Sequence, residues 1–141
     1  MDDEGRVGIL MCAGCAFVCL FLFVSIALTE VAMQDRRLVS CADALASAGV
    51  SGASASTVFA GGSFGVDEET ASSRVDRALA GLSDSTCRVG DGVSIAWVSV
   101  SGGEMEVGVR AHPRVSLLPQ VLRNAVVPEL VRTSSARLRG V

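Results

Sequence analysis

The sequence predicts an α+β fold, in which a long N-terminal helix, transmembrane and then continuing outside the bilayer, carries a small antiparallel sheet with one or two short helices. Three observations support it. Residues 7–29 carry no charge, apolar and small residues then recur at helical spacing over residues 30–48, and two alternating segments flank Gly102-Gly103. The chain of 141 residues has room for one small domain beside the membrane segment.

The amino-acid composition argues against one class of function, nucleic-acid binding. Half of the residues are hydrophobic but only 4% are aromatic, and three of the five phenylalanines fall within residues 17–23. The twelve basic residues, all arginines, stand against 15 acidic ones and leave a net charge of −3. A mildly acidic chain without a basic cluster is not expected to bind nucleic acid.

The uncharged run VGILMCAGCAFVCLFLFVSIALT predicts a transmembrane helix over residues 7–29. As a helix it spans about 34 Å, enough to cross a hydrocarbon core of about 30 Å. The polar N-terminus, residues 1–6, holds three acids and one base, unlike a cleavable signal peptide, and no small-x-small site follows the run. We therefore expect a retained single-pass anchor in the lipid bilayer, and leave open a leader cleaved after Gly5.

Charge gives a weak prediction of orientation. Arg6 precedes the run, whereas Arg36 and Arg37 follow it, so the positive-inside rule favours a cytoplasmic domain by one arginine.

Residues 30–48 contain no proline and no glycine, and they continue the helix outside the membrane. The helix is expected to stop at Gly49, where a Gly/Ser/Ala linker begins and extends over residues 49–66.

The segment RRLVSCADALASA, residues 36–48, directly follows the apolar run. With this segment placed after the apolar run, the chain resembles the TadE/TadG-like minor pseudopilins of actinobacterial Flp-type (tight adherence) pilus systems. The resemblance implies a structural subunit in pilus assembly or secretion, with other pilin-like or pilus-assembly membrane proteins as partners and the domain outside the cytoplasm. Processed pilins carry glutamate five residues after the cut, where this chain has Leu10 after Gly5.

Small residues in the membrane run share one helical face, which predicts a surface for close packing against other helices; they are Gly8, Cys12, Cys15 and Cys19.

The rest of the chain, residues 67–141, is expected to form the small domain. A helix opens at the acidic residues 67–69, and its apolar face holds Val75, Ala78, Leu79 and Leu82.

The stretch between Pro113 and Pro128 predicts a short helix beginning near Pro119 that packs on the sheet, or, alternatively, lies on a membrane surface. Residues 130–138 return as a last strand, with Arg132, Arg137 and Arg139 in water.

Residues 93–101 and 104–110 predict a hairpin around a two-residue turn. An uninterrupted register places Ala96 opposite Val109 on the core face, and Trp97 opposite Gly108 on the other. On that second face, Trp97 either covers the glycine within the molecule or forms a partner patch; the patch would consist of Val93, Ile95 and Trp97.

No catalytic, cofactor or metal site is expected. His112, the single histidine, stands alone, and the glycine pairs lack the lysine or the helix of a phosphate site. We expect no enzymatic activity.

Cys41 and Cys87 lie outside the membrane run. Either they form a disulfide, which would place the domain on an oxidising side of the membrane, or they are two buried free thiols.

Two functions of different classes follow from the sequence. One is the pseudopilin-like structural subunit that the resemblance implies. The other is a membrane-anchored extracytoplasmic binding module, in which the helix is only a tether.

Overall fold

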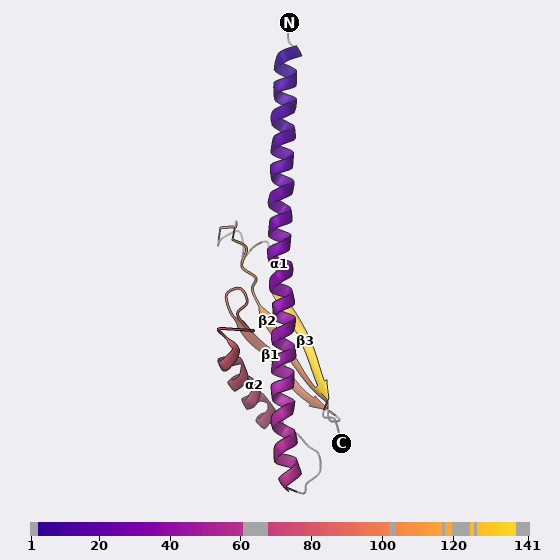
Figure 1. Ribbon diagram of the computed structural model, residues 1–141, viewed down its shortest axis with the longest axis vertical. Helices are drawn as coiled ribbons and strands as arrows, with labels where there is room; N and C mark the ends of the chain where they lie inside the picture. Colours follow the sequence, from indigo (N-terminus) through magenta and orange to yellow (C-terminus); the bar gives the residue numbers. More distant parts are fainter. Residues whose placement is uncertain are drawn as a thin grey trace.

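A computed structural model describes residues 3–60, 68–101, 104–116, 118–119, 125 and 127–137. The described chain has two helices and one three-stranded sheet, in the order α1 (Asp3–Ala60), α2 (Glu68–Leu82), β1 (Val93–Ser101), β2 (Glu104–Ala111) and β3 (Leu130–Arg137). The predicted α+β class is confirmed. Figure 1 shows α1 as a rod whose first half stands free and whose second half lies against α2 and the sheet.

Helix α1 passes from the apolar run into the domain without a break. It has 58 residues, or about 87 Å at 1.5 Å per residue. It is long and apolar enough to cross a membrane, and the apolar window is not buried by any other part of the described chain. Large side chains are exposed around the whole helix, for example Leu20, Phe21 and Leu22, which lie about 100° apart, as a lipid-facing segment requires.

The predicted end of this helix at Gly49 is wrong, because α1 continues to Ala60. Residues 49–60 of the predicted linker are helical, and residues 61–66 lie outside the described chain. Gly49 has a packing role instead. A Cβ added there would collide with the Cε and Sδ atoms of Met105 and come within 3.3 Å of Val75 Cγ2. Glycine lets α1 approach the sheet and α2 at this point.

The domain half of α1 supplies one side of the core. Its fully covered residues recur at three- and four-residue intervals, and they are Leu38, Cys41, Ala42, Leu45 and Ala46. Such spacing places one face of a helix against the sheet. Burial of each leucine contributes about 2 kcal/mol to stability, and the small residues between them permit close approach.

Helix α2 begins at Glu68, with Glu68 and Glu69 in its first turn, where carboxylates interact favourably with the helix dipole. Ala71 and Val75 are buried. The predicted apolar face is confirmed: Val75 belongs to the core cluster, and Ala78, Leu79 and Leu82 pack against it half-buried.

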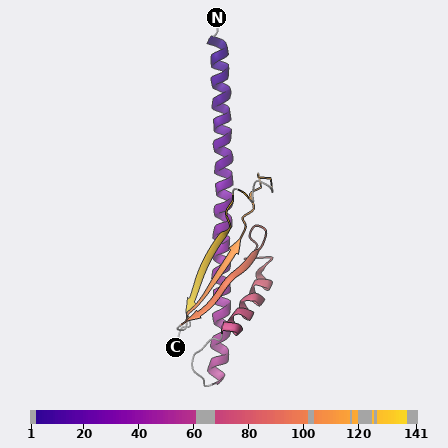
Figure 2. The same cartoon turned by 180° about the vertical axis from the view of Figure 1, so that it is seen from behind.

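The three strands are antiparallel in the order β1-β2-β3. Met105, Val107, Val109 and Ala111 of the central strand β2 face the two helices and are buried. Both views show the sheet lying along the domain half of α1, with α2 beside it (Figures 1 and 2). The predicted last strand is confirmed as β3, whereas the predicted helix near Pro119 falls mostly outside the described residues.

The predicted hairpin register holds from Ser101–Glu104 to Trp97–Gly108 and then slips by one residue. Ala96 is the extra residue of a β-bulge, so Ile95 rather than Ala96 pairs with Val109. The slip turns Val93 and Ile95 towards the core, where they lie half-buried, and leaves Ala96 exposed. The uninterrupted register would have placed the small alanine inside and the large isoleucine outside.

Candidate functional site

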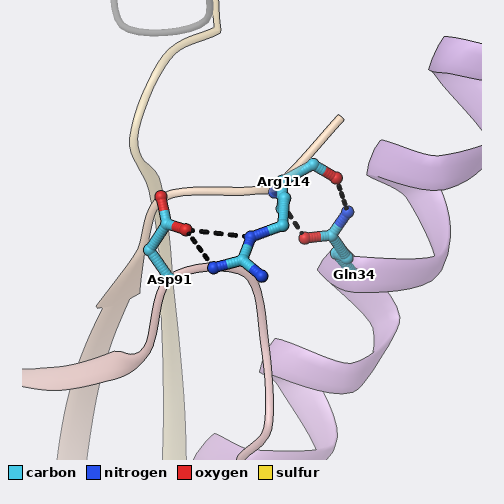
Figure 3. A network of polar contacts seen from close by, with 3 residues as sticks. All are labelled: Gln34, Asp91 and Arg114. Atoms are coloured by element: carbon cyan, nitrogen blue, oxygen red, sulfur yellow. Dashed lines mark hydrogen bonds and ion pairs between the residues drawn. The ribbon is translucent and has the colours of Figure 1, made fainter. Parts of the chain in front are cut away.

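A network of hydrogen bonds joins the domain to α1 where the helix leaves the apolar run. There the chain that follows β2 runs beside the helix, and the side-chain amide of Gln34 bonds to the backbone of Arg114 twice. The Arg114 N–H donates to Gln34 Oε1 at 2.7 Å, and Gln34 Nε2 donates to the Arg114 carbonyl at 2.6 Å. Figure 3 shows this two-way pairing. Gln34 thus acts as a backbone partner for a segment that has left the sheet.

The side chain of Arg114 extends the contact to the loop before β1. Its Nε and Nη2 both donate to Asp91 Oδ1, at 3.0 and 2.8 Å (Figure 3). The Asp91 N–H in turn donates to the His112 carbonyl at 3.2 Å. Gly90 has φ at 53°, and a Cβ there would collide with that same carbonyl oxygen, so the loop requires glycine at this position.

A third contact lies closer still to the membrane run. The Ser116 N–H donates to Glu30 Oε2 at 2.9 Å. Glu30 is the first charged residue after the 23 uncharged ones. We call Glu30, Gln34, Asp91, Arg114 and Ser116 the clamp. Through it, α1 holds the domain at a fixed height above the end of its apolar run.

Strand β3 is fastened to the same helix by two more carboxylates. Asp35 faces Arg132, with Nε 2.8 Å from Oδ1 and Nη2 3.0 Å from Oδ2. The Nη2–Oδ2 contact is a hydrogen bond, whereas Asp35 Oδ1 is buried without a hydrogen-bond partner among the described residues and meets Arg132 as an ion pair alone. Two turns further along α1, Asp43 accepts a hydrogen bond from the Ser134 hydroxyl at 2.5 Å. Arg132 is therefore engaged in an ion pair rather than solvated alone.

Cys41 and Cys87 are joined by a disulfide with a Cα–Cα distance of 4.9 Å. Both are buried, one on α1 and the other in the loop that follows α2. The bond ties the central helix covalently to the chain that leads into the sheet.

The predicted helix-packing residues Gly8, Cys12, Cys15 and Cys19 are brought to one exposed side of α1. The three cysteines are free thiols on its surface. Nothing in the described chain lies within 4 Å of a Cβ added at Gly8. This face is open to lipid or to another helix.

The predicted partner patch does not form, because the bulge at Ala96 separates its members. Val93 and Ile95 pack against the core, while Trp97 stays on the outer face of the sheet. A Cβ on Gly108 would lie 2.5 to 2.7 Å from Cδ2, Cε2 and Cε3 of Trp97. Three ring atoms at nearly equal distance mean that the indole lies flat on the glycine. It covers Gly108 while remaining 42% exposed itself.

Within the described ranges, no three His, Cys, Asp or Glu side chains gather at one point. The exposed ring of His112 has Nδ1 3.9 Å from Glu129 Oε1, which also lies 4.0 Å from Arg110 Nε.

Sequence reasoning missed the clamp. The uncharged amide of Gln34 between Glu30 and Asp35 gave no sign that it pairs with a backbone 80 residues away. The bulge did leave a signal. Apolar residues alternate at 93 and 95 and again at 98 and 100, so the period of two slips between Ile95 and Val98.

Comparison with models of protein families, with characterised proteins and with solved structures found no match.

Proposed function

We propose that the chain is a single-pass membrane protein with its domain outside the cytoplasm, and that it acts as a pseudopilin-like structural subunit in pilus assembly or secretion. In this proposal α1 packs with other pilin-like membrane proteins in the bilayer, and the small domain faces outward. No catalytic step is part of this role.

The observation that carries the proposal is the continuity of α1. The same helix contains the apolar run and the core residues Leu38 and Leu45, which are fully buried. A tether would join the membrane segment to an independently closed domain through a flexible linker. Here α1 supplies one side of the domain core, so the core is incomplete without the helix and movement of the membrane segment moves the domain.

The Cys41–Cys87 disulfide supports the extracytoplasmic side. Structural disulfides persist in oxidising compartments and are rare in the cytosol. This argument outweighs the positive-inside rule. That rule favours a cytoplasmic domain by only one arginine, because Arg36 and Arg37 follow the apolar run and Arg6 precedes it.

Paired cysteine reporters test the orientation. Ser99→Cys places a thiol on the exposed face of β1, and Arg6→Cys places one before the apolar run. In spheroplasts, a membrane-impermeant maleimide should label Ser99→Cys directly and Arg6→Cys only after permeabilisation, with the unsubstituted chain as the background. The reverse pattern would place the domain in the cytoplasm and end the proposal.

Replacement of the apolar run tests the structural role. Residues 7–29 are exchanged for an unrelated leucine-rich span of equal length, which leaves the clamp and the core intact. We expect the protein to remain in the membrane but to lose the partner membrane proteins that co-purify with the natural chain. Cys15→Leu combined with Cys19→Leu is the smaller version of the same test. Unchanged co-purification in both would favour the binding module, for which the helix is only an anchor.

A further inference from the structure

A groove runs along the side of α1 that faces away from the sheet. Its membrane half is a hollow of about 290 Å³ between Leu22, Ile26 and Met33, and Glu30 also lines it. Its domain half, about 430 Å³, lies between Leu28, Met33 and Arg36. The two halves share Thr29 and Met33 and are therefore continuous.

Small side chains form the floor of this groove. Ala32 lies between Leu28 and Arg36, one turn from each, and leaves a notch. The hydroxyls of Ser25 and Thr29 donate to the carbonyls of Phe21 and Ser25, at 2.9 and 2.8 Å. Because these hydroxyls already donate to backbone carbonyls of the helix, an apolar chain can lie along the groove without leaving them buried and unpaired.

Both carboxylates near the groove have partners in the domain, whereas the two arginines at its domain end have none among the described side chains. Glu30, at the edge of the groove, accepts a hydrogen bond from the Ser116 N–H, and Asp35 forms an ion pair with Arg132. Arg36 and Arg37 are exposed and form no ion pair with any residue that the structure describes. Arg36 lies about 200° round the helix from the buried Leu38, which directs it away from the domain. The open side of α1 therefore carries a net positive charge at the domain end of the groove, where Arg36 and Arg37 lie one to two turns beyond Glu30.

The depth of Arg36 matches that of lipid phosphates. Its Cα lies about 10 Å beyond Thr29 along the helix, and an arginine side chain can extend back towards the bilayer. The headgroup layer adds about 5 to 8 Å to each side of the hydrocarbon core. A guanidinium at the end of the groove therefore reaches the phosphate level while its stem covers the apolar floor.

We propose that this groove binds an anionic phospholipid of the leaflet next to the domain, with an acyl chain along Ile26 to Met33 and the phosphate at the guanidinium of Arg36. Arg37 adds positive charge at the same level. The inference rests on the proposed membrane insertion. It adds that α1 binds anionic phospholipids selectively, which insertion alone does not imply.

The test uses the full chain in phosphatidylcholine vesicles that contain a trace of spin-labelled phosphatidylglycerol or spin-labelled phosphatidylcholine. The fraction of each probe immobilised on the protein gives their relative binding. We expect a preference of about fivefold for phosphatidylglycerol, which Arg36→Gln lowers towards unity and high salt weakens.

Two further variants separate a bound lipid from general attraction. Arg77→Gln removes the same charge from the exposed side of α2. Arg77 lies two residues from Val75, which packs near Gly49, far along α1 from the groove, so this variant should keep the preference. Ala32→Leu fills the notch without changing charge and should lower it. A preference that is absent in the natural chain, or that survives Arg36→Gln or Ala32→Leu, would overturn the inference. Failure of the natural chain to float with the vesicles would instead end the proposed membrane role as well.

Discussion

The side-chain amide of Gln34 pairs with both the N–H and the C=O of Arg114, as the backbone of a neighbouring strand would. Segment 112–116 has left the sheet at this point, and an exposed backbone there would otherwise bond to water. The amide therefore continues strand-like pairing from a helix. This contact sets the height of the domain above the apolar run, together with Glu30 and Ser116.

Gln34→Leu should release this segment, because leucine has a similar size but neither donor nor acceptor. We expect the Arg114 amide of the full chain in detergent micelles to exchange its hydrogen faster, and the free energy of unfolding to fall by about 1 kcal/mol. Gln34→Glu keeps the acceptor for Arg114 N–H and should protect that amide better than leucine does. Ser40→Ala, on an exposed part of α1, is the control. Equal exchange in all four proteins would contradict the role of Gln34.

Removal of the disulfide by Cys41→Ser and Cys87→Ser should lower the free energy of unfolding by about 4 kcal/mol, because the bond closes a separation of 46 residues in the unfolded chain. Denaturant unfolding in micelles measures this loss. Cys12→Ser replaces a free and exposed cysteine and should have little effect. A reducing agent that leaves the natural protein as stable as before would show that the bond does not form.

Two glycine-to-alanine changes in helices should have opposite effects on stability. Gly81→Ala in α2 meets nothing within 4 Å and should stabilise the protein by about 0.5 to 1 kcal/mol, because alanine has the higher helix propensity. Gly49→Ala gains the same propensity but must displace the end of the Met105 side chain in a closed core, and we expect a net loss of about 1 kcal/mol. Thermal unfolding of both variants measures the difference. A Gly49→Ala protein as stable as Gly81→Ala would show that α1 does not approach the sheet so closely.

Gly108→Ala should lift the indole of Trp97 from the sheet, since the new methyl group would occupy the space beneath the ring. Trp97 is the only tryptophan and the chain has no tyrosine, so its fluorescence reports on this site alone. We expect the emission to shift to the red as the ring becomes more exposed. Ser99→Ala, on the same face, should leave the spectrum unchanged; a shift of equal size there would argue against the stacked ring.

Ser135→Ala should raise the pKa of Glu104. The hydrogen bond from the Ser135 hydroxyl, and then the hydrogen bond and positive charge of Arg137, hold this pKa below its usual value. Because the folded pKa is the lower one, the contact contributes its full stability above the pKa of the unfolded chain and loses it as the pH falls through the folded value. NMR titration of the Glu104 carboxyl measures the shift, with Ser72→Ala on α2 as the control. An unchanged titration in Ser135→Ala would mean that the hydroxyl does not bond to the carboxylate.

Local patterns predicted the elements whose cause is local. The uncharged run, the acidic start of α2 and the Gly102-Gly103 pair each lie within or beside the element that they indicate. The apolar face of α2 and the strand β3 were predicted for the same reason.

Features that depend on distant contacts were missed. Gly49 has the local sequence of a helix stop, and nothing near it in the sequence indicates that Met105 packs against it. Gln34 and Arg114, 80 residues apart, show no pattern that pairs them. The bulge lies between these cases: the alternation of apolar residues slips near Trp97, but a two-residue turn on its own predicts one uninterrupted register over the whole hairpin.

In the proposed membrane protein, the unbroken course of α1 converts a tilt of the apolar run into a larger displacement of the domain. Gly49, at the far side of the core, lies about 30 Å beyond Thr29 along the axis. A tilt of about 20°, common for helices in bilayers, would carry that point about 10 Å sideways. The clamp and the disulfide fix the domain on α1. A thicker bilayer or a neighbouring helix that tilts the apolar run slightly would therefore displace the exposed face of the sheet by a larger distance.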